Sequence, residues 1–269
     1  MNGHKKFLFL HSFHNFQNLT KNVVNKNTYK SAFDIYKEEL SNYCLLSYLE
    51  NLDSILKNVL IPKRIIEFTG YSESTTIICL RFCISVQLPR NLGGLEKEAF
   101  YIDTTGNFSI EKVKDLASDF TKKYLDVGKF NVNSILKHIY YTKVNNFTQL
   151  MGCIFELELF LQGKNVSLIV VNSITFVLRC LEVRERFEAI NEFFKQMSYL
   201  ADKYNVIVII TNFPTTRINK NETYTTASLG DSFYHLVNSR ISFTKIGSIF
   251  KAKLEKSLLH SECEVSFQI

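Results

Sequence analysis

The stretch RIIEFTGYSESTTIICLRFCISVQL, residues 64–88, decides the predicted fold. It begins with a short apolar run that ends at Gly70 and is typical of a buried strand. A long apolar run with helical character follows from Thr75 onward. A strand, a short loop and a helix in this order are typical of a parallel α/β sheet, so the loop 70–76 is expected at the carboxyl edge of that sheet.

The rest of the chain repeats this alternation. Further strand-like runs are separated by segments with helical periodicity, which predicts a mostly parallel, twisted sheet flanked by helices. The last three runs alternate apolar and polar residues, which predicts an antiparallel C-terminal edge with one solvent-facing side. The predicted strands are 64–70, 98–103, 138–144, 167–172, 206–211, 240–246, 249–255 and 263–269, and the predicted helices are 109–125, 146–161 and 185–204.

The composition indicates an intracellular globular protein with reduced thiols. The chain has only 10 Gly and 3 Pro, which argues against long linkers. Its 6 cysteines form no CxxC pair and have no metal-ligand spacing, so no metal site is expected. The net charge of +6 permits an anionic partner. No apolar run is long enough for a signal sequence or a membrane span. Residues 1–28 are predicted to be a flexible arm before a core over 29–269.

Polar residues follow four of the predicted strands, at the edge where open α/β sheets bind ligands. Because such residues are common in every sheet of this kind, their identity matters more than their position. They are the loop 70–76, Asp103-Thr104-Thr105-Gly106, Asn172 and Thr211-Asn212-Phe213.

Several stretches resemble, in the same order, the RecA family, and within it the eukaryotic strand-exchange recombinases and their paralogues. HIYY and LIVVNSITFVLR are most similar to the C-type paralogue, and the meiotic spindle-class paralogues are also similar. The resemblance covers about residues 29 to 269 and implies a RecA-like ATPase core without the family's N-terminal helical DNA-binding domain. The matching stretches are VQLPRNLGG (86–94), EAFYIDTTGNF (98–108), KVKDLA (112–117), ILKHIYY (135–141), LIVVNSITFVLR (168–179), VIVIITNFPTTRI (206–218) and LGDSFYH (229–235).

The resemblance implies a nucleotide site, but this sequence departs from the family at each of its motifs. The family loop is G-x-x-x-x-G-K-[ST], in which the lysine reaches the β- and γ-phosphates. Here Gly70 opens a loop that is one residue shorter, and Ser74-Thr75-Thr76 stands where Gly-Lys-Thr is expected. Thr105 replaces the glutamate that orients the attacking water. Asn172 replaces the magnesium-associated aspartate, and Phe213 replaces the glutamine that senses the γ-phosphate.

These departures predict a site without catalytic residues and without a required cofactor. Each lost charge-assisted contact costs about 1.5–3 kcal/mol, and phosphoryl transfer depends on such contacts. ATP and Mg²⁺ are expected only if the degenerate site still binds them weakly. Its residues are Gly70, Ser74, Thr75, Thr76, Asp103, Thr105 and Asn172.

The same residues also admit a purely structural role. Asp103 and Asn172 can cap helices or close turns, and Gly70 can serve backbone conformation alone. Thr75 and Thr76 can cap the helix that follows the loop, whether or not an anion is bound.

The resemblance also assigns residues that contact DNA. Arg217 and Lys220, in the stretch 215–228, occupy the second DNA-facing loop of the family. Arg179, Arg184 and Arg186 occupy the first loop. With so few cations, weak binding without sequence specificity is expected, and a solvated basic loop is the alternative.

Tyr29 and Ala32 are the predicted partner-binding residues. Members of the family join head to tail when a linker strand inserts a Phe-x-x-Ala motif into the neighbouring protomer. In this chain Tyr29 and Ala32 stand at that spacing, before the core.

The sequence therefore predicts a non-catalytic recombinase paralogue that supports double-strand-break repair by homologous recombination, with meiosis as the expected setting. It would act in the nucleus, bind other paralogues in a hetero-oligomer, and contact the main recombinase and DNA, but no membrane. The first alternative is an active DNA-dependent ATPase with a rebuilt or partner-completed site. The second is an α/β enzyme for a small molecule, for which the sequence offers no nucleophile–base pair.

Overall fold

The computed structural model describes residues 30–41, 44–123, 130–219 and 222–269. The chain divides into two compact units, Met1–Asn42 and Tyr43–Ile269. The helix described in the first unit is α2 (Ala32–Ser41), and every strand belongs to the second unit. The arm predicted over residues 1–28 lies outside the described residues, so it stays a prediction.

The second unit is built on an eight-stranded sheet in the order β10-β9-β8-β1-β5-β4-β2-β3. All pairs from β8 through β1 to β3 are parallel, whereas β9 and β10 are antiparallel to their neighbours. The strands are β1 (Ile65–Gly70), β2 (Glu98–Asp103), β3 (Ile139–Lys143), β4 (Val166–Asn172), β5 (Ile207–Asn212), β8 (Ser239–Ile246), β9 (Ile249–Lys256) and β10 (Cys263–Phe267). The predicted fold class, a RecA-like mixed sheet with an antiparallel C-terminal edge, is confirmed.

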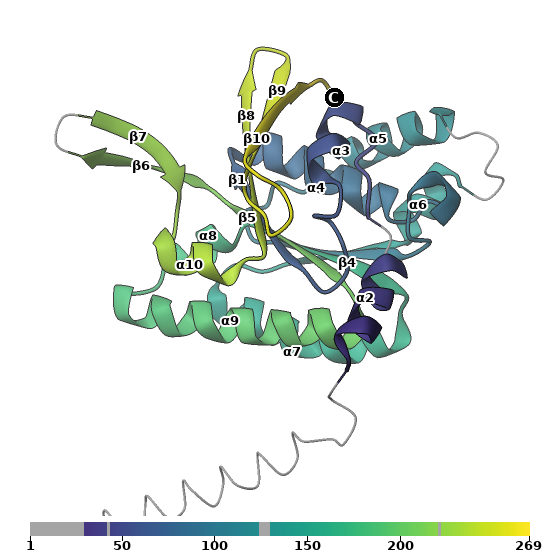
Figure 1. Cartoon of the computed structure of the whole chain (residues 1–269). Coiled ribbons are helices and arrows are strands. Elements are labelled where there is room, and N and C mark those ends of the chain that lie inside the picture. Colours follow the sequence, from purple (N-terminus) through teal and green to yellow (C-terminus); the bar gives the residue numbers. More distant parts are fainter. Residues whose placement is uncertain (1–29, 42–43, 124–129, 220–221) are drawn as a thin grey trace, which may run out of the picture. The chain divides into compact units, whose positions relative to one another are not determined.

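Helices cover both faces of this sheet (Figure 1). One face packs against α3, α4, α5 and α6, and the other against α7, α8, α9 and α10. The helices are α3 (Glu50–Leu56), α4 (Ser72–Ser85), α5 (Ile110–Lys123), α6 (Val132–Lys137), α7 (Phe147–Gly163), α8 (Ile174–Arg179), α9 (Val183–Tyr204) and α10 (Gly230–Leu236), with a short 3-10 helix over Arg90–Leu92.

The alternation of side chains along each strand divides the core into two layers. In β1, Ile66 and Phe68 join the layer under α4, while Ile65 joins the layer above α9. All six residues of β1 are buried, because helices cover both faces. The apolar run at the start of the quoted stretch is thus a central strand. Glu67, in the middle of that strand, is buried with it.

The stretch 215–228 was predicted to be a loop, and that prediction was wrong. Strands β6 (Pro214–Asn219) and β7 (Glu222–Ala227) form a separate antiparallel hairpin that projects from the sheet (Figure 1). Threonine dominates these strands and favours extended backbone. The resemblance to a DNA-facing loop concealed this signal.

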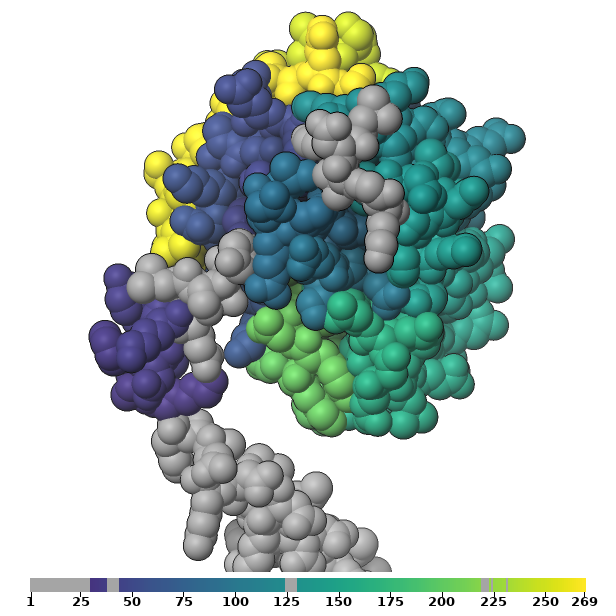
Figure 2. Space-filling model, turned by 90° about the vertical axis from the view of Figure 1, so that its right-hand side faces the viewer, coloured from purple at the N-terminus to yellow at the C-terminus, as the bar shows by residue number. Residues whose placement is uncertain are grey.

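The two edges of the large sheet lie far apart. Strand β3 forms one edge and strand β10 the other. Figure 2 shows the C-terminal strands, in yellow, and residues 110–123 and 130–150, in blue to teal, on different sides of one face. The parallel edge strand β3 pairs only with β2 in the described part of the sheet.

Candidate functional site

The connection from β1 to α4 differs from a phosphate loop in length and in hydrogen bonding. Strand β1 ends at Gly70 and helix α4 begins at Ser72, so only Tyr71 lies between them. The backbone amides of Ser74 and Thr75 donate to the Tyr71 carbonyl at 3.0 and 3.2 Å. Residues 71–75, all of them described, therefore form the N-cap and first turn of α4 rather than an open loop of free N–H groups.

Gly70 is required by packing. Its φ angle is 153°, and a Cβ atom at this position would lie 2.6 Å from the carbonyl oxygen of Phe243 in β8. A larger residue would push β8 away from β1, so the structural alternative predicted for this glycine has a physical cause.

The three hydroxyl side chains that replace Gly-Lys-Thr point into the fold. Ser74, Thr75 and Thr76 are each at most 5% exposed. The Thr75 hydroxyl donates to the Tyr71 carbonyl at 3.3 Å. The Thr76 hydroxyl accepts a hydrogen bond from Asn172 at 2.9 Å. Two of these hydroxyls are therefore already bonded within the protein.

Asn172 lies at the end of β4, fully buried, and bonds side chains from three other elements. Its amide nitrogen donates to the hydroxyl oxygens of Thr76 at 2.9 Å and Tyr101 at 2.6 Å. Its amide oxygen accepts from the Thr211 hydroxyl at 2.5 Å. Burial raises the pKa of Tyr101 well above its usual value, so all four groups are neutral. The position of the expected magnesium-associated carboxylate is thus the centre of an uncharged network.

Asp103, the remaining acidic residue of the predicted site, closes a turn. One carboxylate oxygen accepts from the backbone amides of Thr105 and Gly106 at 2.9 and 2.8 Å. The other accepts from the backbone amide of Phe108 at 3.2 Å. The Thr105 hydroxyl also donates to Asp103, at 3.1 Å. Asp103 is fully buried, and its lone pairs are used by the turn that follows β2.

A second buried network adjoins the first and contains the charged pair Glu67–Arg240. These residues face each other on β1 and β8, and Arg240 Nε lies 2.7 Å from a Glu67 carboxylate oxygen. The Asn212 amide donates to the other carboxylate oxygen of Glu67 at 2.6 Å and to the Ser228 carbonyl at 2.8 Å. The Thr175 hydroxyl donates to the Asn212 amide oxygen at 2.5 Å. The network therefore connects the sheet to the base of the β6–β7 hairpin.

Burial and the Arg240 charge act in opposite directions on the pKa of Glu67, and burial, which raises it, has the larger effect. The Nη2 atom of Arg240 is buried without a hydrogen-bond partner among the described residues. The Tyr234 ring, 4.6 Å from the guanidinium carbon, supplies a cation–π contact.

Sequence reasoning missed Glu67, Arg240, Tyr101 and Thr175. The signal for Glu67 was present, because a carboxylate inside an apolar strand needs a charged or hydrogen-bonding partner. The partner, Arg240, opens a predicted strand 173 residues later. Only the pairing of β1 with β8 connects the two.

The structure describes some of the predicted DNA-binding residues. Arg217 lies on β6 and is exposed, whereas Lys220 lies outside the described residues. Arg184 is exposed in the first turn of α9. Arg217 and Arg184 are thus available to an anionic partner.

Two arginines of the first predicted DNA-facing loop have bonds within the protein. Arg179 donates to the Ser228 hydroxyl at 2.7 Å. Arg186 donates to the carbonyls of Leu178 and Leu181, both at 3.0 Å, and so joins α8 to α9. A structural role accounts for these contacts.

Of the two predicted partner-binding residues, the structure describes Ala32. Ala32 is the exposed first residue of α2, and Tyr29 lies outside the described residues.

The described ranges contain neither a cluster of metal-ligating side chains nor a helix suited to a membrane. No cluster of three His, Cys, Asp or Glu side chains is suited to a metal ion there. No helix in those ranges has the length and apolar character needed to cross a membrane.

Comparison with known proteins agrees with this geometry. The family model described as Rad51 matches residues 44–269. This chain is 29% identical over 258 residues to DNA repair protein RAD51 homolog 3 of Cricetulus griseus, covering 89% of this chain and 70% of that protein. It is 28% identical over 274 residues to the protein of the same name from Dictyostelium discoideum, covering 96% and 72%.

An archaeal protein is also similar. DNA repair and recombination protein RadA of Aeropyrum pernix is 31% identical over 190 residues, covering 68% of this chain and 57% of that protein. The resemblance to recombinase paralogues that the sequence predicted is confirmed by these matches.

Proposed function

Because the chain belongs to the Rad51 family, we propose that it is a non-catalytic subunit in DNA double-strand-break repair by homologous recombination. The names of its relatives, DNA repair protein RAD51 homolog 3 and DNA repair and recombination protein RadA, support a role in repair. The subunit would bind other recombinase paralogues in a hetero-oligomer, contact the main recombinase and DNA, and act in the nucleus, with meiosis as the setting.

One observation carries the non-catalytic part of the proposal. The polar groups at the carboxyl ends of the strands bond to one another, with Asn172 at the centre of an uncharged network. A triphosphate needs cations and free N–H groups in this position. To be bound here, it would have to replace internal bonds of Thr76 and Asp103 without the lysine that normally compensates. Each missing charge-assisted contact weakens binding by about 1.5–3 kcal/mol.

The function of the chain would then be to bind partner proteins. Edge strand β3 has one unpaired side in the described sheet, and Tyr141 on it is 45% exposed. An exposed strand edge can accept an additional strand from another chain. Tyr29 and Ala32 would supply the complementary contact to a neighbouring paralogue.

DNA contact would come from the β6–β7 hairpin. Arg217 is exposed on β6, and Lys220 follows two residues after Ile218, which is 79% exposed. So few cations support weak, salt-sensitive binding without sequence preference.

A second candidate, an active DNA-dependent ATPase with a rebuilt site, has one observation in its favour. Lys245 on β8 lies 2.5 Å from Glu73 in the first turn of α4. It therefore brings an ammonium group beside the degenerate loop, although Glu73 already neutralises it. A partner could also complete the site.

Nucleotide binding and hydrolysis by the purified chain distinguish these candidates. We expect no saturable binding of a fluorescent ATP analogue at micromolar concentration and no ATPase above background, with or without single-stranded DNA. The Lys245→Ala variant is the matched control. DNA-stimulated hydrolysis that is lost in Lys245→Ala would establish the rebuilt site and overturn the non-catalytic proposal.

A further inference from the structure

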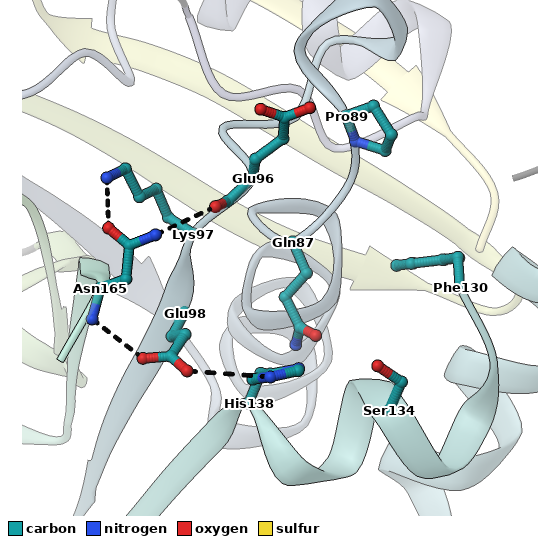
Figure 3. Close-up of a pocket in the computed structure, with 9 residues that line it drawn as sticks. All are labelled: Gln87, Pro89, Glu96, Lys97, Glu98, Phe130, Ser134, His138 and Asn165. Carbon is teal, nitrogen blue, oxygen red and sulfur yellow. Dashed lines mark hydrogen bonds and ion pairs between the residues drawn. The ribbon is translucent and has the colours of Figure 1, made fainter. Parts of the chain in front are cut away.

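A pocket of about 300 Å³ lies at the amino-terminal end of the sheet, opposite the edge that holds the degenerate site. It is formed where β2 and β3 begin and where the chain leaves α4 (Figure 3). Its walls come from α6, from the segment that leads into β2 and from the turn before β4. The lining residues are Gln87, Pro89, Glu96, Lys97, Glu98, Phe130, Ser134, His138 and Asn165.

The polar groups of this pocket are mostly hydrogen-bond acceptors. The Gln87 amide nitrogen donates to the carbonyls of Cys83 and Ile135 at 3.0 and 3.1 Å. Both of its N–H groups are used, so the amide oxygen of Gln87 remains as an acceptor. Figure 3 shows the side chains of Gln87, Ser134 and His138 around the same space.

Glu98 is the most buried acid of the pocket, with a side chain that is 17% exposed. Its oxygens accept from the Tyr140 hydroxyl at 3.2 Å and from the backbone N–H of Asn165 at 3.1 Å. Each carboxylate oxygen has two lone pairs, so these bonds leave acceptor capacity on both atoms. His138 Nε2 lies 3.9 Å away and adds a positive charge only when it is protonated.

The pocket holds more negative than positive charge. Glu96 is exposed at its rim and has no ion-pair partner among the described residues. Lys97 is the lysine of the lining, and its ammonium group is bonded to the Asn165 side chain (Figure 3). Lys164 lies behind Tyr140 and partly offsets the charge of Glu98 without lining the pocket.

We propose that this pocket binds a guanidinium group, and that the group is the arginine side chain of a partner protein. Glu98 and Glu96 provide charge, the Gln87 oxygen provides a further acceptor, and the Phe130 ring provides an aromatic wall. A guanidinium presents five N–H donors in one plane and stacks on aromatic rings, so it matches this set of groups better than a compact ammonium does. The proposal does not rest on the role of the chain in recombination.

The probe is the blocked tripeptide acetyl-Ala-Arg-Ala-amide, added to the full ¹⁵N-labelled chain and followed by the backbone amide signals of Gly94, Ser134 and Asn165. Its control replaces arginine by citrulline, which has nearly the same shape and no charge. We expect saturable shifts with the arginine peptide and affinity at least about tenfold lower with citrulline, because a charge-assisted hydrogen bond is worth about 1.5–3 kcal/mol.

Two variants test the assignment of the carboxylates. Glu98→Gln is expected to weaken peptide binding about tenfold, and Glu96→Gln, at an exposed position, about threefold. Glu156→Gln, an exposed acid on α7, is the matched control and should change nothing. Equal affinity for the citrulline peptide, absence of shifts, or insensitivity to both pocket variants would overturn the proposal.

The source of the guanidinium is tested with agmatine, which carries the group without a peptide backbone. Stronger binding of the tripeptide than of agmatine would support a partner protein. Agmatine that binds as tightly as the tripeptide would overturn the partner-protein assignment and leave the pocket as a site for a small guanidinium compound.

Discussion

At the scale of single residues, the buried pair Glu67–Arg240 makes the sharpest prediction about stability. Both side chains are less than 10% exposed, and each is the other's ionic partner. Removing one leaves an isolated charge in the core, which typically costs about 3–5 kcal/mol, whereas replacing both by apolar groups is often neutral. We therefore expect Glu67→Met to lower the free energy of unfolding by about 3–5 kcal/mol, and Glu67→Met with Arg240→Met to regain most of that loss.

Urea denaturation of the unmodified protein, of Glu67→Met and of the double variant measures these free energies of unfolding. The exposed pair Lys251–Glu264, 3.1 Å apart on the antiparallel edge, is the control. Lys251→Met should change stability by less than about 1 kcal/mol. A loss below about 1 kcal/mol for Glu67→Met, or a double variant that is less stable than Glu67→Met, would contradict the account of the pair.

The polar network at the strand ends could not be predicted from the sequence, for a physical reason. Asn172 bonds Thr76, Tyr101 and Thr211, which lie on three other elements. These side chains meet only because of the register between neighbouring strands, and that register is determined by the folded sheet rather than by local sequence. The sequence identified Asn172 as a departure from the family. It did not indicate which groups would satisfy its amide.

At the scale of elements, periodicity predicted the large sheet well and the small hairpin poorly. Strands such as β4, VSLIVVN, are continuous apolar runs because helices cover both of their faces. The β6–β7 hairpin has no such cover, so its threonine-rich strands carry polar residues on both sides and resemble a loop. Burial generates the pattern that sequence reasoning detects, and an exposed hairpin lacks it.

The same hairpin carries the prediction about DNA. Because Arg217 is exposed and Lys220 is the other cation assigned to this segment, Arg217→Ala with Lys220→Ala should remove about two phosphate contacts. Affinity for single-stranded DNA should fall for every sequence alike, and the slope of log affinity against log salt should become less steep by about 1.4. Fluorescence anisotropy of a labelled oligonucleotide at several salt concentrations measures both quantities.

The exposed lysine Lys195 on α9 is a suitable control, because Lys195→Ala removes one charge at a site with no predicted DNA contact. If the hairpin variant retains both its affinity and its salt dependence, the β6–β7 hairpin is not where this chain meets DNA.

At the scale of the whole molecule, the prediction concerns assembly. Tyr29 precedes the sheet-bearing unit and is the aromatic of the predicted linker motif. Buried aromatics are typical interface hot spots, so Tyr29→Ala should weaken binding to a paralogue partner by about 2 kcal/mol or more. Isothermal titration with the partner measures the affinity, and thermal unfolding of the variant alone checks the fold.

Tyr36 on α2, 55% exposed, provides the comparison, since Tyr36→Ala removes an aromatic of the same kind outside the motif. Equal losses from the two variants would show that the motif has no special role. A fall in thermal stability that accompanies the loss of binding would mean that Tyr29 is part of the core.

The closed network around Asn172 has a consequence for timing. In proteins that hydrolyse nucleotide, the change from triphosphate to diphosphate can determine when a bound partner is released. Under the proposed function, a chain whose strand-end groups are bonded to one another would lack this means of release. The duration of its complexes would then be set by the dissociation rate of the interface and by the concentration of the partners. Regulated dissociation of a complex would then require another protein, either a partner that hydrolyses nucleotide or a competitor for the same surface.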